Sequence, residues 1–341
     1  MKKRIFLFLF IMLFISGCGK YKVSDAVKDF ENKVDNSKSY KLTGTMEISS
    51  SEEVFTYSLE AYHLKDDFFK VILVNQTNNH EQIILKNNDG LYVVTPSLNK
   101  SFKFDSVWPE NSSQAYLLGN LVKDMKNDSK IEMEEKDKGY IIKTTVNYPN
   151  NEEMKYQKIY FNEDMKIEKV EVFNESDIIK IKVNFNKVDL KAKLSDEDFV
   201  LDDLIDEEKT KPECKDDSCD KETSSTLDSI IYPLYIPANT YLNNKETVES
   251  LKSERIILTF SGEKNFVIVE EAAKASNVFE VIPIYGEPLM LNETIGALSS
   301  NSLSFQANNV DYYIVSSDLS TKEMISVAAS LGNTTSVAGV K

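Results

Sequence analysis

The sequence predicts an α+β fold made mainly of antiparallel strands and divided into two domains. Many segments alternate apolar and polar residues with a period of two, and polar turns such as 87–90 separate them. This regular spacing is typical of an antiparallel meander. A few other segments carry apolar residues three and four positions apart, which predicts helices. The length of 341 residues suits about two domains of ordinary size.

The N-terminus resembles a bacterial lipoprotein signal. A basic start at 2–4 precedes an apolar run at 5–15, which leads into Ser16, Gly17 and Cys18. A membrane-spanning helix needs about 20 apolar residues, so this run is too short to span and suits a signal peptide. The resemblance implies cleavage after residues 1–17 and a diacylglycerol on Cys18. We therefore expect a mature chain anchored to the extracytoplasmic face of the cell membrane; the alternative is an ordinary signal with a chance cysteine.

The first domain, residues 18–205, begins with a helix in which Ala26 and Phe30 share an apolar face. Strands follow, and a helix at 112–125 interrupts them. About ten strands with one apolar face must curl, so the helices are available to cover the concave side. The strands are expected at 54–63, 68–74, 81–86, 90–95, 100–105, 130–135, 139–146, 154–161, 166–173 and 178–189.

The inner face of the curled sheet is expected to turn toward the helix at 112–125. Alternate residues of the strands at 54–63 and 178–189 point inward, and the helix turns its apolar side toward them. The space between them is either filled core or a cavity that receives a ligand. The residues expected to line the cavity are Phe55, Tyr57, Leu59, Leu118, Leu121, Val122, Met125, Ile181 and Val183.

An acidic segment separates the two domains. Residues 196–222 hold 4 basic and 13 acidic side chains, whose mutual repulsion favours a solvated linker, placed at 206–226. The start of the segment, around Phe199, is apolar enough to form a short helix docked on the first domain. Cys214 and Cys219 lie in the linker. Thiols oxidise outside the membrane, which favours a disulfide; free thiols and, least of all, a metal site are the alternatives, since further ligands are lacking nearby.

The second domain, residues 227–333, is expected to be a smaller α+β unit, followed by a tail at 334–341. Its final helix has clear start and stop signals. Ser320 and Glu323 form a capping box, Leu319 and Met324 are placed for a hydrophobic staple, and Gly332 ends the helix. The strands are expected at 230–236, 255–260, 265–270, 279–284, 302–306 and 310–316.

Composition excludes several functions. The formal net charge is −15, without a basic stripe, which argues against nucleic acid as a partner. The chain has two histidines, His63 and His80, too few for most histidine-based catalysis or metal binding. The Ser97–Lys100 segment matches a Ser-x-x-Lys motif, but the partner tripeptides of that enzyme class are missing. We expect a non-enzymatic protein with no metal site and no cofactor.

Several segments together resemble a known family. They are 82–86, 90–104 and above all the Trp-Pro-Glu-Asn-Ser-Ser string at 108–113. They look like the YdcC-type sporulation lipoproteins of Gram-positive spore-formers, in the superfamily that includes the LolA and LolB carriers and the MucB/RseB regulators. The resemblance covers roughly residues 18–205. A weaker one, at 312–320 with the final helix, links residues 227–333 to the C-terminal domain of such proteins.

The resemblance implies a LolA-like unclosed barrel, in which a curved sheet of about eleven strands wraps over helices and an apolar cavity. It also implies a non-enzymatic role in binding lipid, acyl chains or a protein. We expect a cell-envelope lipoprotein, linked to sporulation or germination, that binds a lipid-like ligand or an envelope protein. The alternative is a regulatory subunit that docks on a cell-wall, cortex-modifying enzyme or on an anti-sigma factor, with the cavity serving only as core.

Overall fold

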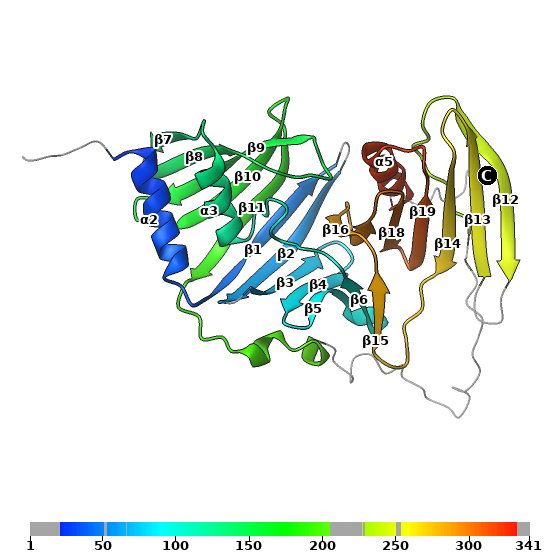
Figure 1. The fold of residues 1–341 in the computed structure, drawn as a ribbon, viewed down its shortest axis with the longest axis horizontal. Helices are drawn as coiled ribbons and strands as arrows, with labels where there is room; N and C mark the ends of the chain where they lie inside the picture. Colours follow the sequence, from blue (N-terminus) through cyan, green and yellow to red (C-terminus); the bar gives the residue numbers. More distant parts are fainter. Residues whose placement is uncertain are drawn as a thin grey trace, which may run out of the picture.

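The described part of the chain forms two sheets and three α-helices, arranged as Figure 1 shows. The computed structural model describes residues 21–50, 53–65, 67–204, 227, 229–249 and 254–332. The larger sheet has twelve strands in the order β15-β6-β5-β4-β3-β2-β1-β11-β10-β9-β8-β7. Its end strands do not pair, so the sheet curves without closing. This confirms the predicted α+β class and the unclosed barrel.

The larger sheet is a meander in chain order, apart from the β1–β11 pairing that joins its two halves and the β15–β6 pairing at one edge. Helices α2 (Val23–Asp35) and α3 (Leu118–Asn127) lie against its concave face. Its strands from the first part of the chain are β1 (Ser39–Ser49), β2 (Val54–Leu64), β3 (Phe68–Asn75), β4 (Glu81–Asn87), β5 (Gly90–Thr95), β6 (Lys100–Phe104), β7 (Glu132–Lys136), β8 (Gly139–Thr145), β9 (Met154–Asn162), β10 (Ile167–Asn174) and β11 (Ile179–Asp189).

The smaller sheet has seven antiparallel strands, and helix α5 (Thr321–Gly332) packs on one of its faces. The strand order is β12-β13-β14-β19-β18-β17-β16. The strands are β12 (Thr240–Glu249), β13 (Glu254–Gly262), β14 (Phe266–Ala272), β16 (Glu287–Met290), β17 (Ile295–Leu298), β18 (Ser302–Ala307) and β19 (Val310–Val315).

Side chains that alternate along the strands pack together to form the core on the concave face. In β2, Phe55, Tyr57 and Leu59 are all buried, while the residues between them face the other side of the sheet. From α2, Phe30 meets Phe161 of β9 edge to face at 4.9 Å between ring centres. The strand period predicted from sequence therefore assigns the inward face of β2 correctly.

The segment after β11 docks on the convex face, as its apolar residues suggested. It forms two short 3-10 helices, η2 (Asp196–Phe199) and η3 (Asp202–Leu204). Phe199 is buried between Phe68 and the outward residues of β4 and β5. The Lys70 ammonium donates to the Asp198 carbonyl at 2.5 Å and so fixes η2 in place. The rest of the predicted linker, with Cys214 and Cys219, lies outside the described residues.

Strand β15 (Glu280–Ile284) comes from the second part of the chain but joins the larger sheet. It runs parallel to β6, with Glu280 opposite Lys100 and Ile284 opposite Phe104. Among the described strands this is the one parallel pairing. The segment leaves the smaller sheet after β14, covers the edge of β6 and returns as β16 (Figure 1). The two parts of the chain therefore share a sheet.

Two sequence-based expectations were wrong in detail, and the strands β1 and β12 were not predicted at all. Residues 230–236 form no strand: Pro233 lacks an amide hydrogen, Ile230 and Ile231 pack against the core of the smaller sheet, and Leu234 is exposed. The helix predicted at 112–125 starts only at Leu118. Ser113 is held in a loop because its backbone amide donates a hydrogen bond to the Asn147 carbonyl at 2.7 Å. Strand β12 was not predicted, because it lies at an edge and nearly all its residues are exposed.

The predicted capping box at the last helix is confirmed. The Ser320 amide donates to Glu323 Oε2 at 2.8 Å, and the Glu323 amide donates back to Ser320 Oγ at 3.3 Å. Leu319 and Met324 are both buried beside it, as a hydrophobic staple requires. In the part of the chain that the structure describes, no helix has the length and apolar character needed to cross a membrane.

Each sheet leaves two edge strands, β15 and β7 in the larger sheet and β12 and β16 in the smaller. Pro283 lies in β15 and Pro288 in β16. Four of the five residues of β7 are charged, with the sequence EMEEK. Strand β12 carries Lys245, Glu246 and a further glutamate at its end.

Candidate functional site: an apolar pocket between the two sheets

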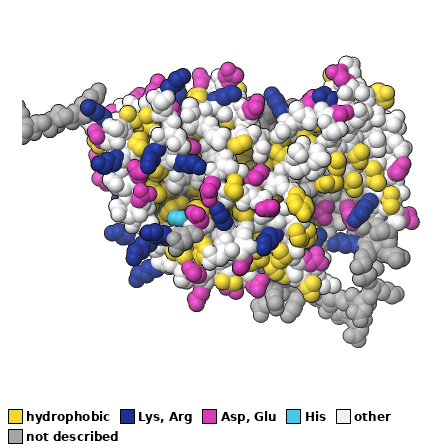
Figure 2. Space-filling model, in the orientation of Figure 1, with side chains coloured by type: hydrophobic (Ala, Val, Ile, Leu, Met, Phe, Trp, Pro, Cys, Tyr) yellow, Lys and Arg dark blue, Asp and Glu magenta, His cyan; other side chains and the backbone are white. Residues whose placement is uncertain are grey.

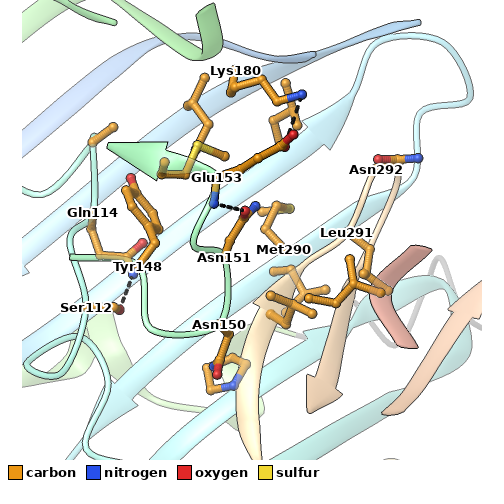
Figure 3. A pocket seen from close by; sticks show the side chains of 18 of the residues that line it. Ser112, Gln114, Tyr148, Asn150, Asn151, Glu153, Lys180, Met290, Leu291 and Asn292 are labelled. Atoms are coloured by element: carbon orange, nitrogen blue, oxygen red, sulfur yellow. Dashed lines mark hydrogen bonds and ion pairs between the residues drawn. The ribbon is translucent and has the colours of Figure 1, made fainter. Parts of the chain in front are cut away.

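An apolar pocket of about 350 Å³ opens where the concave face of the larger sheet meets the second part of the chain (Figure 3). Three structural units form its walls: the larger sheet, the loops around it, and the β16–β17 hairpin with α5. Its apolar lining residues are Met46, Ile48, Ile84, Trp108, Ala115, Tyr116, Tyr148, Pro149, Met154, Ile181, Pro288, Leu289, Met290, Leu291, Ile295, Ile325 and Ala329.

The sheet wall follows from strand register. Ile48 of β1 lies opposite Ile181 of β11, and Met46 lies opposite Val183. Residues directly opposite on neighbouring strands point to the same side of a sheet, so all of these face the concave side. Val183 is fully buried deeper in the core, while Ile48 and Ile181 lie nearer the strand ends and border open space.

The β16–β17 hairpin closes the pocket from the other side. Gln82 Oε1 of β4 accepts a hydrogen bond from the Ile295 amide at 2.7 Å and one from Thr294 Oγ1 at 3.2 Å. The Tyr57 hydroxyl donates to the Asn292 carbonyl at 2.5 Å. Ile295 packs in the core of the larger sheet, whereas Leu291 packs in the core of the smaller one. The hairpin therefore joins the two cores.

Helix α5 uses two faces. Met324, Val327 and Leu331 are buried in the core of the smaller sheet. Ile325 and Ala329, one turn apart on another face, line the pocket. Packing of α5 on the smaller sheet thus fixes the position of the helix. That packing in turn places Ile325 and Ala329 at the pocket.

Polar side chains gather at one side of the pocket. Lys180 Nζ lies 3.3 Å from Glu153 Oε2, and the amide of Glu153 donates to Asn151 Oδ1 (Figure 3). Gln114 Nε2 donates to Ser112 Oγ at 2.9 Å. Burial raises the pKa of the Tyr116 and Tyr148 hydroxyls well above the ordinary value, so both rings stay neutral. Most of the pocket lining is apolar, uncharged polar side chains make up part of it, and Lys180 and Glu153 are its two charged residues.

The nine residues predicted to line a cavity are all on the concave side, but they divide into two groups. Ile181 lines the pocket. The other eight are buried in the core of the larger sheet, where they pack against one another: Phe55, Tyr57, Leu59, Leu118, Leu121, Val122, Met125 and Val183. Cys18, Cys214 and Cys219, the predicted lipid-attachment and disulfide residues, lie outside the described residues.

The two histidines serve packing. His63 lies between the rings of Tyr40 and Phe69, each with its ring centre 4.8 Å away, and its Nδ1 is 3.2 Å from the Phe68 carbonyl. Burial lowers its pKa. His80 was expected to be exposed in a turn, but it is half-buried and its Nε2 has no partner among the described residues. In the described ranges, no three His, Cys, Asp or Glu side chains cluster as a metal site requires.

Sequence reasoning missed the hairpin and the α5 face that complete the pocket. The hairpin strands are four residues each, too short to show a period. The run of Leu289, Met290 and Leu291 is apolar enough to indicate a buried segment. What it packs against is set by residues some 200 positions earlier, such as Gln82, and local sequence carries no signal for that.

The chain is similar in sequence to a protein named for its part in sporulation. It is 36% identical over 324 residues to the sporulation protein YdcC of Bacillus subtilis (strain 168), and the match covers 95% of this chain and 94% of that protein. The chain belongs to the YdcC family of sporulation proteins. No family model matches the chain.

Solved structures show more distant likeness to this member of the YdcC family. The crystal structure of MucB has a TM-score of 0.35 and 12% identity, covering 92% of this chain and 98% of that one. A LolA superfamily protein from Nitrosomonas europaea has a TM-score of 0.32 and 11% identity, covering 53% of this chain and 99% of that one. 

Proposed function

We propose that the protein is a non-enzymatic envelope protein that binds a lipid-like ligand in the pocket between its two sheets. The observation that carries this is the apolar lining of a pocket of about 350 Å³. Ligand pockets are typically ~300–1,000 Å³, mostly apolar, with a few polar groups that fix orientation. The pocket of this chain has the same character, with its ion pair of Lys180 and Glu153 at the rim.

The proposal also covers where the protein is held in the cell and the cellular process in which it takes part. The signal at residues 1–18 supports a chain held at the extracytoplasmic face of the membrane through diacylglycerol on Cys18. Membership of the YdcC family supports a role linked to sporulation or germination. Replacing Cys18 with alanine is expected to move the protein from the membrane to the soluble fraction without unfolding it. Retention of the alanine variant in membranes after a high-salt wash would contradict the anchor.

Displacement of a fluorescent fatty acid tests the ligand. Ile48→Gln puts an amide on the pocket wall and should weaken fatty-acid binding severalfold, because the acyl chain would meet a polar group there. Glu47→Gln is the matched control, since Glu47 points to the opposite face and contacts Lys182. Wild-type protein that binds no fatty acid at any concentration would refute the proposal. Equal loss in both variants would place the ligand elsewhere.

A second candidate function is docking of an envelope protein, such as a cortex-modifying enzyme or an anti-sigma factor. A specific surface favours it: Ile257, Val269 and Tyr313 lie side by side on β13, β14 and β19, on the face away from α5. Tyr313 is 46% exposed. Figure 2 shows hydrophobic side chains gathered over this region. Exposed apolar patches often mark interaction sites.

Purification from native membranes separates the two candidates. Tyr313→Ser should lose a co-purifying protein if the patch is its docking site, while Tyr285→Ser, at a tyrosine outside the patch that is 84% exposed, should retain it. A lipid that co-purifies equally with both variants supports the pocket. Recovery of neither lipid nor protein with the wild type would contradict both candidates.

A further inference from the structure

We propose that the pocket holds a single hydrocarbon chain, so that its ligand is a single-chain amphiphile. Comparison of the pocket volume with that of a known apolar cavity gives a chain of roughly 14 carbons. This inference rests on the proposed function and adds the class of ligand. It is carried by the size of the pocket, by the fixed floor, and by the position of the polar rim.

The size argument compares volumes. An apolar cavity of ~150 Å³ accepts one benzene ring, which has six carbons. On that scale, the pocket of about 350 Å³ accommodates about 14 carbons of an acyl chain. A two-chain phospholipid or a triacylated lipoprotein has at least twice that apolar volume. Such a ligand therefore does not fit while the pocket keeps this size.

The floor of the pocket is rigid. Ile84, Trp108, Ala115 and Ile295 line it, and each is at most 7% exposed. They belong to the continuous core of the larger sheet, where close packing leaves little room for movement. Ile295 is further held by the bond from its amide to Gln82. A longer chain therefore cannot gain space by pushing the floor back.

The rim fixes the direction of entry. The Lys180–Glu153 pair, with Asn151 beside it, lies at the wetter side of the pocket. Glu153 is 47% exposed there, in contrast to the buried floor. A polar head group keeps its hydration or pairs with these side chains at the rim. The methyl end of the chain then points toward Trp108.

A chain-length series tests the inference. Fatty acids of 8 to 18 carbons are titrated against the whole mature protein below their micelle concentrations, by displacement of a fluorescent fatty acid. Affinity should rise about four-fold per added methylene, the equivalent of ~0.8 kcal/mol each. The rise should stop near 14 carbons, when the pocket is full. A two-chain phosphatidylglycerol should compete at least ten-fold more weakly than the best single chain.

A variant of α5 shifts the limit. Ala329→Leu adds three carbons to the pocket wall, so the plateau should begin about three carbons earlier. Lys322→Leu adds a leucine on the exposed side of the same helix and should leave the plateau where it is. Thermal melts check that both variants fold. If Ala329→Leu does not fold, Ser326→Leu on the same pocket face replaces it.

The outcomes distinguish this inference from the proposed function. Affinity that still rises beyond 16 carbons, a plateau that Ala329→Leu leaves unmoved, or a two-chain lipid that binds as tightly as the best fatty acid would overturn the single-chain inference alone. Absence of binding by every chain length would overturn the proposed function together with it. A plateau near 14 carbons that shortens in Ala329→Leu and not in Lys322→Leu supports both.

Discussion

Glu270 is the most unusual single residue of the second part of the chain. It lies on β14, opposite Tyr312 of β19, and is fully buried in the core side of the smaller sheet. Its Oε2 accepts a hydrogen bond from the Ile231 amide at 3.1 Å, while its Oε1 has no partner among the described residues. Burial raises the pKa of this carboxyl from 4.5 to about 7.

This burial makes stability depend on pH. Because the folded pKa lies above the unfolded value, the stabilising effect of the neutral acid is complete below about pH 4.5 and is lost as the pH rises through 7. We predict that the free energy of unfolding of the wild type falls by about 1–3 kcal/mol between pH 6 and pH 9. Glu270→Gln should remove this fall, as measured by urea unfolding at several pH values.

Glu271→Gln is the control, because Glu271 is the next residue on β14, points to the other face and pairs with Arg255. It should keep the wild-type pH dependence. A wild-type profile that is flat from pH 6 to pH 9, or one that both variants alter equally, would contradict the role of Glu270.

Leu118 provides the second prediction at this scale. It was predicted to line the cavity, yet it is fully buried in the core of the larger sheet. Leu118→Ala should therefore cost about 2–5 kcal/mol of stability, from lost burial and the void left behind. Binding of fatty acid, measured under conditions where the variant is folded, should stay within about two-fold of the wild type. A large change in binding with little change in stability would place Leu118 at the pocket instead.

Inward orientation could be predicted from sequence, but exposure to the pocket could not. The period of β2 and β11 assigns Tyr57, Ile181 and Val183 to the concave side, because alternation is a local property of a strand. Whether an inward residue meets another side chain or open space depends on what comes from elsewhere in the chain. Ile181 borders the pocket that the β16–β17 hairpin also lines, whereas Val183 is enclosed by the core of the larger sheet.

Among the elements, the β16–β17 hairpin is held to the larger sheet by hydrogen bonds to Gln82 and from Tyr57. Gln82 is buried and accepts hydrogen bonds from both Ile295 and Thr294. Gln82→Leu would leave both donors without their acceptor, and we predict a loss of about 1–3 kcal/mol in stability. Hydrogen exchange at the Ile295 amide should rise at the same time. Gln76→Leu, at an exposed turn, is the control; equal effects in the two variants would show that the contact is not specific.

Length alone did not decide which elements could be predicted, because β1 and β12 were missed although they carry eleven and ten residues. Strands such as β2 and β11 carry eleven residues each, enough for the alternation to stand out. The α5 start was readable because Ser320 and Glu323 form a local motif. Strand β15 was found as a strand, but its place in the larger sheet was not foreseen. Partner choice of a strand depends on distant backbone, and the 3.0 Å bond from the Glu280 amide to the Asn99 carbonyl has no local signature.

At the scale of the whole molecule, the two parts of the chain are joined by more than the acidic linker. The β15–β6 pairing, the Gln82–Ile295 bond and the ion pair of Lys100 with Asp311 all cross between them. We predict that a protease cuts within residues 206–226, which carry the acidic linker. The two fragments should then remain together in gel filtration in native buffer and separate only in urea.

The control for this experiment is a nicked Gln82→Leu variant, which should need less urea for separation. Fragments that elute separately without denaturant would show that the contacts between the two parts are too weak to hold them. Complete degradation in place of two fragments would show that the linker is not the preferred site of cleavage.

The edge strands also govern how neighbouring molecules behave toward one another. Copies held on one membrane by the proposed anchor would meet at a high effective concentration, and an open strand edge offers a ready template for polymer growth. Here Pro283 and Pro288 each remove a donor from an edge, and the charges of β7 and β12 repel an incoming strand. Crowding should therefore leave these molecules as separate particles, so that contacts among them arise through side-chain surfaces and not through continued sheets.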